Sequence, residues 1–529
     1  MILNLTLFLS IIWALNLLYG EWFAYLVPSL WTCSWPHLQH SSSSSPKGVD
    51  YSSDYVKIAV VTDPQLMDKT SLPLAPKSLA LEIAQFYTDL YMRRAFISSV
   101  LPFKPDVVLF LGDYFDGGYK LSDDEWQESL GRFRHIFNLN MLQKSSKLKV
   151  YYLSGNHDIG YSAFISWKPE IVKRYDREFG ARNFKVKIGK VDFIAVDAQT
   201  LDGLPQGNFT SDTWKFVKNV SEDTSSTPRV LLTHIPLYRP DWTHCGPHRY
   251  SPVINQRINH ADRDQEILYQ NYITENSSNA LLDQIRPALV LSGHDHDQCT
   301  VIHKSNKHGP VTEHTVGTVS WQQGNLYPSF MLLSVSNSVK ADGSNSEEDY
   351  ISTHLCFLPM QMHIYLWYLT LFAMTLVIVL LWPANEVLIF KKLGNLTVSV
   401  RSLYNSLISR VKEKNEDDNC EYEEIWDAEG SMHLIKKTKK VPQTSLTEGS
   451  SVERGNAVMR SKARKQTAPE VDESNADVSI HIGSTARTNR SKAKMIIWRL
   501  VRALRALITI AAFNVPLYVL LVFKDWIDK

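Results

Sequence analysis

The chain has 529 residues and carries 56 lysines and arginines against 55 aspartates and glutamates, which gives a formal net charge of +1. This length is too great for one ordinary domain. Because the charge is balanced, the chain has no global basic field, and nucleic acid is not indicated as a partner.

The first apolar segment, Ile2–Tyr19, carries no charged side chain. Such a segment is either a cleaved signal peptide or an uncleaved signal anchor. The basic residues that usually precede the apolar part of a signal peptide are missing, and apolar and aromatic residues continue to about Trp35. We therefore favour an N-terminal signal anchor or transmembrane segment over residues 1–35, followed by a serine-rich linker over residues 36–55.

Five apolar, β-branched runs in residues 56–340 each end in polar residues. Runs of this length, bounded by turn residues, are typical of buried strands. Strands and helices alternate early in this region and strands dominate later, which predicts an α/β sandwich. Open α/β sheets carry their chemistry at the carboxyl ends of strands, so we expect the polar residues to lie together. The runs are VKIAVVTD, DVVLFLGD, KVYYLSGNHD, RVLLTHIP and PALVLSGHDH.

The rest of the chain alternates between apolar and polar segments. After a linker over residues 341–363, the uncharged run at 364–382 is long enough to cross ~30 Å of hydrocarbon as a transmembrane helix. Residues 383–503 are polar and predict a largely disordered loop, in which CEYEEIWDAEGSMHLIKK is a candidate docking motif or short helix. Residues 504–523 form a third candidate transmembrane helix before a tail at 524–529. Arg505, Asn514 and Pro516 interrupt this last run, so an interfacial helix is its alternative.

Charged flanks predict the topology of these spans. Lys391 and Lys392 follow the second span, and Arg499 and Arg502 precede the third. Because positive flanks stay in the cytosol, the loop at 383–503 is predicted to be cytosolic and the region at 56–340 lumenal. Met1 would then face the cytosol and the C-terminus the lumen.

Two weaker signals agree with a lumenal region at 56–340. It contains three glycosylation sequons, which begin at Asn208, Asn219 and Asn276. Four cysteines also lie on the predicted lumenal side, and they permit three complete pairings, or free buried thiols, among which the sequence does not choose. These cysteines are Cys33, Cys245, Cys299 and Cys356.

The five polar clusters, in their order along the chain, resemble the motif set of the calcineurin-like metallophosphoesterase superfamily over about residues 56–335. Within it, TDPQLMD and GDYFDGG resemble a narrower group, the eukaryotic membrane phosphoesterases that remove ethanolamine phosphate from glycosylphosphatidylinositol (GPI) anchors. The resemblance implies a two-sheet metallophosphoesterase sandwich (αββα) with a dinuclear metal site.

The resemblance also implies the metal ligands. Asp113 matches the carboxylate that bridges both ions in the family. Two divalent ions, expected to be Mn²⁺, would neutralise a phosphodiester and lower the pKa of a shared water. If the segment around His294 and His296 is extended, both side chains leave the same face and reach one ion each. The implied ligands are Asp63, Gln65 and His296 with the first ion, and Asn156, His234 and His294 with the second.

Two further roles follow from the pattern. His157 matches the family histidine that protonates the leaving oxygen, and Asp158 is expected to orient and charge it. Arg239, His244 and His248 are weaker candidates for the substrate mouth, with ordinary loop residues as the alternative.

Gln65 departs from the family pattern, which has histidine at this position. A glutamine ligates only through its neutral carbonyl oxygen, a harder donor than imidazole, which favours Mn²⁺ or Mg²⁺ over Zn²⁺. The GPI-trimming group contains members with the same Asp-Pro-Gln spelling, so the departure does not indicate an inactive protein.

The expected function is therefore a metal-dependent phosphoric ester hydrolase. The resemblance makes it a multi-pass glycoprotein of the endoplasmic reticulum or Golgi membrane that removes ethanolamine phosphate from a GPI-anchor mannose. Its partners would be the GPI-anchored substrate and cargo-transport receptors, and its activity would promote export of GPI-anchored proteins. The alternatives are a phosphatase or nucleotide phosphodiesterase of the same fold, or a non-catalytic cargo receptor or scaffold.

Overall fold

The computed structural model describes residues 2–41, 54–140, 148–224, 227–251, 254–262, 264–304, 309–337, 350–382, 421–426, 432–437 and 492–527. The chain divides into two compact units, one of residues 1–379 with 502–529 and one of residues 380–501. The first unit contains the α/β domain and most of the apolar helices.

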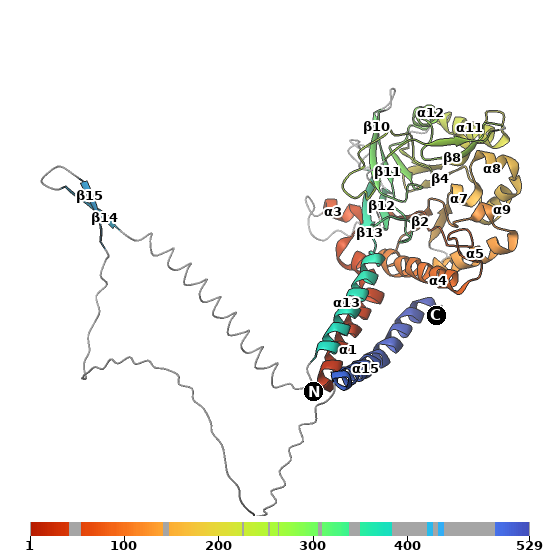
Figure 1. The fold of residues 1–529 in the computed structure, drawn as a ribbon. Helices are drawn as coiled ribbons and strands as arrows, with labels where there is room; N and C mark the ends of the chain where they lie inside the picture. The colour runs from red at the N-terminus through yellow and green to blue at the C-terminus, as the bar shows by residue number, and fades with distance from the viewer. Residues whose placement is uncertain are drawn as a thin grey trace, which may run out of the picture. The chain divides into compact units, whose positions relative to one another are not determined.

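Two mixed sheets form the centre of the domain (Figure 1). In the first, β1 pairs in parallel with β2, which pairs in parallel with β3. In the second, β5, β6 and β9 are parallel neighbours. In order across the first sheet, the strands are β13 (Ile351–Phe357), β12 (Ser329–Ser336), β1 (Tyr55–Val61), β2 (Val107–Phe110) and β3 (Lys149–Tyr152). The second sheet runs β10 (Cys299–Lys304), β11 (Pro310–Thr315), β9 (Leu289–Ser292), β6 (Arg229–Leu232), β5 (Val191–Ala195) and β4 (Phe184–Ile188).

The alternation of side chains along the strands explains why the sheets stack. In β1, Ile58 and Val60 belong to the apolar cluster between the two sheets, which also contains Val230 and Leu291. Ala59 belongs to a separate cluster on the outer face of the first sheet. Because strand side chains alternate between faces, an apolar run buries both faces at once.

Helices cover the two outer faces, so the domain has four layers, and the expected αββα sandwich is confirmed (Figure 1). Helices α4 (Leu79–Arg94), α5 (Asp123–Ile136) and α9 (Pro169–Phe179) pack on the first sheet. Helices α11 (Asn208–Ser221) and α12 (Glu275–Ile285) pack on the second. Short elements fill the connections: α7 (Asn156–Ile159), α8 (Ser162–Trp167), α10 (Ala198–Leu201), and the two-stranded sheet of β7 (Ile258–His260) and β8 (Ile267–Gln270).

The domain extends past its expected end. Strand β13 lies within residues 341–363, which the sequence suggested were a linker, and it pairs with β12 along its whole length. Its alternation of polar and apolar residues, ISTHLCF, is typical of an edge strand with one buried face.

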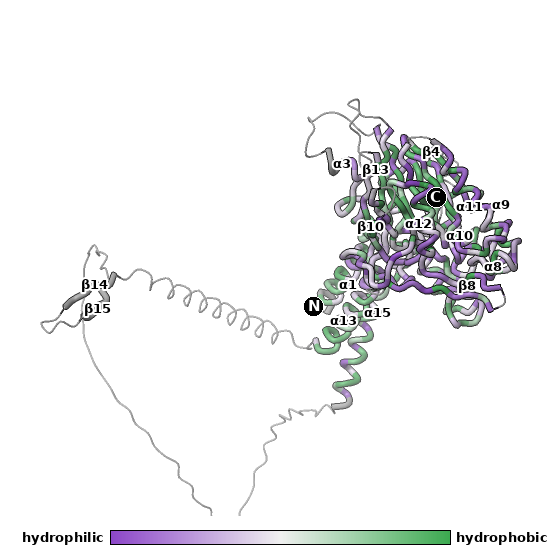
Figure 2. The backbone as a smooth tube through the Cα atoms, turned by 90° about the horizontal axis from the view of Figure 1, so that it is seen from above, coloured by the Kyte–Doolittle hydropathy of each residue, from purple (hydrophilic) through white to green (hydrophobic). Residues whose placement is uncertain are grey.

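Among the described residues, three helices are long and apolar enough to cross a membrane (Figure 2). The first runs from α1 (Ile2–Leu18) through π-helical and α-helical turns to Thr32. The second is α13 (Gln361–Leu381), and the third is α15 (Lys492–Trp526), which begins twelve residues before the span expected at 504–523. The first two helices lie antiparallel, since Trp13 donates to Thr375 at 3.0 Å and Tyr25 donates to Gln361 at 2.8 Å.

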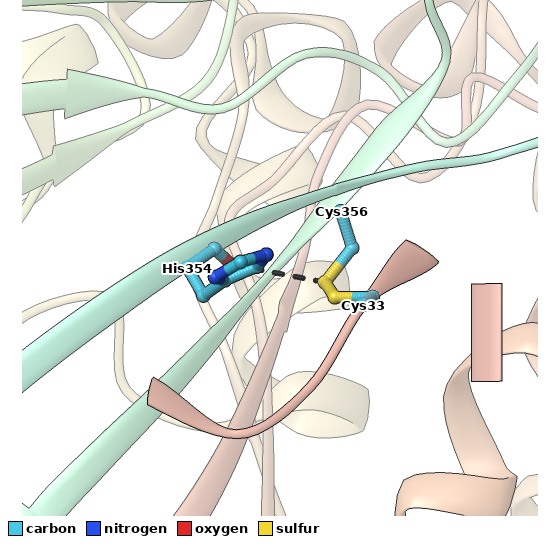
Figure 3. A group of neighbouring side chains, drawn as sticks. All are labelled: Cys33, His354 and Cys356. Carbon is cyan, nitrogen blue, oxygen red and sulfur yellow. Dashed lines mark hydrogen bonds between the residues drawn. A yellow bond between two sulfur atoms is a disulfide. The ribbon is translucent and has the colours of Figure 1, made fainter. Parts of the chain in front are cut away.

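Two disulfides join the four cysteines of the predicted lumenal side, Cys33 with Cys356 and Cys245 with Cys299. Figure 3 shows the first bond, between the end of the N-terminal helix and β13, with His354 beside it. These three side chains also have the spacing of a metal site, but sulfurs joined to each other are not thiolate ligands. Disulfides form in oxidising compartments, so the chain is a membrane protein whose α/β domain lies outside the cytosol.

Only two strands are described within residues 383–491. Strands β14 (Glu421–Trp426) and β15 (Met432–Lys437) pair antiparallel in the segment CEYEEIWDAEGSMHLIKK, so its expected short helix is replaced by strands. The prediction of disorder for the rest of this loop falls outside the described residues, as does the serine-rich part of the linker at 42–53.

Candidate metal centre

The candidate ligands meet where strands of both sheets end. Asp63 and Gln65 follow β1, and Asp113 follows β2. The short helix α7 after β3 brings Asn156 and His157, while His234 follows β6. The loop after β9 brings His294 and His296. Parallel neighbours end at the same edge of a sheet, which is why residues from Asp63 to His296 converge.

Asp113 lies at the centre of the cluster. It belongs to two groups of metal-ligand atoms, one with His234 and His294 and one with Asp63 and His296, and within each group these atoms lie within 4.8 Å of one another. Its Oδ2 is 3.2 Å from Nε2 of His234. A carboxylate shared by two ligand groups is the geometry that a bridged pair of ions requires.

Five of the candidate ligands have left-handed backbone conformations. Their φ angles are 49° at Asp63, 39° at Gln65, 55° at Asp113, 68° at His294 and 57° at His296. Non-glycine residues adopt this region at a cost, and such residues cluster at functional sites. The expectation that His294 and His296 lie in an extended segment is therefore wrong, and the tight turn instead brings both side chains toward the aspartates.

Two glycines let these turns approach one another. Gly112 has a φ of 98°, and a Cβ there would lie 2.6 Å from Nδ1 of His234. A Cβ on Gly155 would lie 2.0 Å from Oδ1 of Asp113. Only glycine fits at these two positions, because a side chain would displace the candidate ligands.

Hydrogen bonds orient the histidine imidazoles. Nδ1 of His234 donates to the carbonyl of Leu111 at 2.6 Å, which directs its Nε2 toward Oδ2 of Asp113 and Oδ1 of Asn156, at 3.2 and 3.1 Å. The Nε2 of His294 lies 3.2 Å from the carbonyl of Gln270, so its Nδ1 is the nitrogen available to an ion. Backbone carbonyls commonly fix the tautomer of metal-binding histidines in this way.

Gln65 also lies in the cluster. Its amide nitrogen donates to Oδ2 of Asp113 at 3.1 Å and lies 2.9 Å from Nε2 of His296. Rotating the amide by half a turn would place its oxygen where the nitrogen now lies, between Asp113 and His296. The oxygen could then face an ion.

The electrostatics of the cluster suit bound cations. Asp63, Asp113 and Asp158 are three buried carboxylates within one small region, and burying such charges is costly without a compensating positive charge. Burial raises the pKa of Asp63, and burial together with the charge of Asp113 raises the pKa of Asp158 to about 7. Burial opposes ionisation of Asp113 too, but His234 and His157 hold its pKa below the ordinary value. Burial and His234 lower the pKa of His294 to about 3, so its imidazole is neutral. Burial also opposes the charge of His234, but Asp113 outweighs it and raises the pKa of His234 to about 9, so ligation by His234 requires loss of a proton.

His157 has a different partner from the one expected. Its Nδ1 donates to the carbonyl of Asp116 and lies 3.6 Å from the Asp116 carboxylate. The carboxylate of Asp158 instead accepts from the backbone N–H groups of Asp113, Tyr114 and Gly155. Asp158 therefore fixes the loop that carries Asp113, and Asp116 orients the His157 ring. Burial lowers the pKa of His157, but Asp113 and Asp116 outweigh this and raise it overall, which favours a proton donor.

A pocket of about 310 Å³ opens over the cluster, and its lining differs from the expected substrate mouth. Arg239 is fully buried, with its Nη2 3.1 Å from Glu313, and is not among the described lining residues. His244 and His248 are exposed elsewhere, the second with its ring 4.8 Å from that of Phe357. The segment at 249–272 supplies the wall through Arg249, Ser251, Asn255, Tyr269, Asn271 and Tyr272. None of these residues was predicted from the sequence. Two very short strands, β7 and β8, bring them to the pocket, and strands of this length leave no recognisable pattern in the sequence.

Residues 56–298 match the family model described as calcineurin-like phosphoesterase. This domain is a calcineurin-like metallophosphoesterase. Cell division control protein 1 of Saccharomyces cerevisiae is 30% identical over 329 residues, which cover 59% of this chain and 63% of that protein. Metallophosphoesterase 1 of Mus musculus is 26% identical over 367 residues, covering 65% and 81%. A solved structure of Vps29 from Entamoeba histolytica aligns with 57% of this chain and all of its own, at 11% identity and a TM-score of 0.23, which supports no argument about function.

The metallophosphoesterase domain has residue types suited to hydrolysis of a phosphoric ester. Metal ions held by these residues would supply positive charge to the phosphate oxygens and would lower the pKa of a bound water. Asp113 would hold both ions from the centre of the cluster. His157 lines the pocket, and with Nδ1 engaged by Asp116 its Nε2 is the atom that can donate a proton to a leaving oxygen.

Proposed function

We propose that the protein removes ethanolamine phosphate from a mannose of the GPI anchor, as a phosphodiesterase on the lumenal face of the secretory-pathway membrane. One combination of features carries this proposal. The cluster of metal-ligand residues lies in a domain outside the cytosol, and apolar helices anchor that domain to the membrane. A lipid-linked glycan facing the lumen is a phosphodiester substrate that such a domain can reach.

In this proposal the seven candidate ligands hold two Mn²⁺ ions, with Asp113 between them, and His157 is the general acid. The loop at 383–503 and Met1 face the cytosol, while the C-terminus faces the lumen. The protein resides in the endoplasmic reticulum or Golgi. Trimming the glycan promotes export because an added phosphate changes the charge and shape that a cargo-transport receptor reads.

The sequence resemblance of TDPQLMD and GDYFDGG to GPI-trimming phosphoesterases supports this substrate. The similarity to metallophosphoesterase 1 proteins of Mus musculus and Drosophila melanogaster, at 26% and 24% identity, is consistent with it. The three sequon asparagines are all exposed on helices of the domain, as glycosylation in the lumen requires.

Mass spectrometry of GPI glycans released from knockout and parent cells tests the proposal. We expect the knockout to carry additional ethanolamine phosphate on mannose and to export GPI-anchored proteins more slowly. Re-expression of the wild type restores both, whereas the Asp113→Ala variant restores neither. Identical glycans in knockout and parent cells would exclude this substrate, and restoration of export by Asp113→Ala would favour a scaffold.

A further inference from the structure

The wall of the pocket opposite the metal cluster comes from one segment, residues 249–272. We call this segment the 249–272 wall. It contains the small sheet of β7 and β8, and it lies between β6 and α12 in the chain.

The 249–272 wall is fastened to the loop that carries His294 and His296. Arg249 pairs with Asp295 through two contacts of 2.6 and 3.2 Å, and Asp297 accepts from the backbone N–H groups of Tyr250 and Ser251 at 2.8 and 2.7 Å. Alternate residues of this loop therefore serve the two sides of the pocket: the histidines face the metal cluster, and the aspartates hold the wall. The disulfide between Cys245 and Cys299 closes the same junction covalently.

The face of this wall carries a chain of neutral hydrogen-bonding groups. The hydroxyl of Tyr269 donates to Oδ1 of Asn271 at 2.5 Å, and Nδ2 of Asn271 donates to the backbone and side-chain oxygens of Asn255 at 2.8 and 3.0 Å. Tyr269 is 36% exposed and Asn255 is also exposed, so the ring and the end of the chain remain accessible at the pocket.

The charged side chain that this wall contributes to the described pocket lining is already paired. The Arg249 guanidinium is bound to Asp295 and to the carbonyl of Ser251 at 2.7 Å, whereas Arg257 lies over the Tyr269 ring, 5.9 Å from its centroid, and is not among the described lining residues. The phosphate is expected at the metal side of the pocket, so the wall meets what the phosphate is attached to. Amide and phenol groups beside an accessible aromatic ring suit a neutral, hydroxyl-rich group, because they donate and accept hydrogen bonds without requiring a counter-charge.

We propose that Tyr269, Asn271 and Asn255 form a subsite for the sugar that carries the scissile phosphate. This inference rests on the proposed phosphodiesterase function and adds the residues that select the substrate. Asn271 accepts from a sugar hydroxyl through the Oδ1 lone pair that Tyr269 leaves free, and Asn255 holds its amide in place, while the Tyr269 ring lies against the sugar. A ligand without hydroxyls cannot make this bond and binds more weakly.

Inhibition of small-diester hydrolysis by full-length protein in phosphatidylcholine nanodiscs tests the subsite. The inhibition constants of methyl α-mannoside 6-phosphate and of inorganic phosphate are compared as a ratio, which cancels changes at the metal side. In Asn271→Leu we expect the mannoside constant to rise roughly tenfold relative to that of phosphate. Tyr269→Phe, a milder change, should raise the ratio by a smaller factor, about threefold.

Asn279→Leu is the matched control, because Asn279 is an exposed asparagine of α12 outside the described pocket lining. It should leave the ratio unchanged. A ratio within twofold of wild type in both Asn271→Leu and Tyr269→Phe would overturn the subsite. The subsite would also be overturned if the two variants raise the inhibition constant of adenosine monophosphate and leave that of the mannoside unchanged. The wall would then bind a nucleoside rather than a sugar.

A binding measurement without metal gives a second readout. Saturation-transfer NMR should show contact between methyl α-mannoside and EDTA-treated protein, and the signal should fall in Asn271→Leu but not in Asn279→Leu. Equal signals in the two variants would contradict the subsite. Unchanged GPI glycans in the knockout would exclude the proposed function while leaving these results intact, so the two failures are distinguishable.

Discussion

Arg94 of α4 donates a hydrogen bond of 2.5 Å to Glu21 of the N-terminal helix, and both side chains are almost fully buried. The same guanidinium lies 3.2 Å from the carboxylate of Asp525, near the end of α15. One arginine of the phosphoesterase domain thus joins the first and last apolar helices. The end of α15 therefore packs against the domain, close to Glu21 in the second half of the first helix (Figure 1).

Replacing Arg94 with methionine should destabilise the protein by roughly 3–5 kcal/mol, because the buried Glu21 carboxylate then loses its cation, whereas Asp525 keeps Lys524 at 2.7 Å. Chemical unfolding in nanodiscs measures the change. The double variant Arg94→Met with Glu21→Gln should recover part of the loss, since the unpaired charge is removed. If the double variant loses as much free energy of unfolding as Arg94→Met and Glu21→Gln lose together, the two residues are not coupled.

Asp113→Ala should release both ions and abolish hydrolysis, because the carboxylate at the centre of the cluster belongs to both ligand groups. Elemental analysis of purified protein gives the metal content per chain. The control is Asp212→Ala, an exposed aspartate of α11 that should keep wild-type metal and activity. Two ions retained in Asp113→Ala would contradict the bridging position.

His157→Ala should retain its metal but lose turnover by ~10²–10⁴-fold, as expected for removal of a general acid. The loss should shrink for p-nitrophenyl diesters, whose leaving group needs little protonation, and remain large for alkyl diesters. Asp116→Asn should cause a smaller loss in the same pattern, since it keeps the backbone carbonyl that holds the ring and removes only a charge that raises the His157 pKa. Equal losses on both classes of diester would rule out proton donation by His157.

Gln65→His should shift activity from Mn²⁺ toward Zn²⁺ without unfolding the domain, because imidazole is a softer ligand than an amide oxygen. The measurement is the ratio of activities after EDTA treatment and reconstitution with each metal. The side chain lies among the candidate ligands, 3.1 Å from Asp113, so a histidine there can reach the same position. An unchanged ratio would mean that residue 65 does not contact an ion.

In sealed microsomes, the domain at 56–335 should resist added protease and carry glycosidase-sensitive mass at the exposed sequons. A tag inserted between residues 412 and 490 should be digested, because the flanking basic residues keep this loop in the cytosol. Detergent should abolish the protection of the domain. A protected tag in intact microsomes would reverse the topology.

The sequence predicts the fold and the neighbourhood of the site because each candidate ligand directly follows a strand. Asp63, Asp113 and His234 come within three residues of a strand end, and the order of parallel strands then dictates that they meet. The sandwich itself is confirmed, whereas the roles of the individual ligands remain predictions.

Side-chain partners could not be predicted in the same way. Asp158 follows His157 directly, but the helical turn of α7 points its carboxylate back to the backbone of residues 113–114. Arg239 follows a motif strand, yet Glu313 of another strand draws it into the interior. The partner of each side chain is a residue more than forty positions away in the sequence. The residues adjacent in sequence therefore do not reveal which partner it has.

The bond between Cys33 and Cys356 spans 323 residues. At a synthesis rate of about 5–20 residues per second, the first of these cysteines leaves the cytosol roughly 16–65 s before the second. Throughout that interval Cys33 lacks its native partner while Cys245 and Cys299 emerge, and an oxidant in the oxidising compartment can join it to either of them. Correct maturation of this chain therefore depends on the order of oxidation during translocation, and a thiol isomerase in the lumen would be needed to reverse an early mispairing.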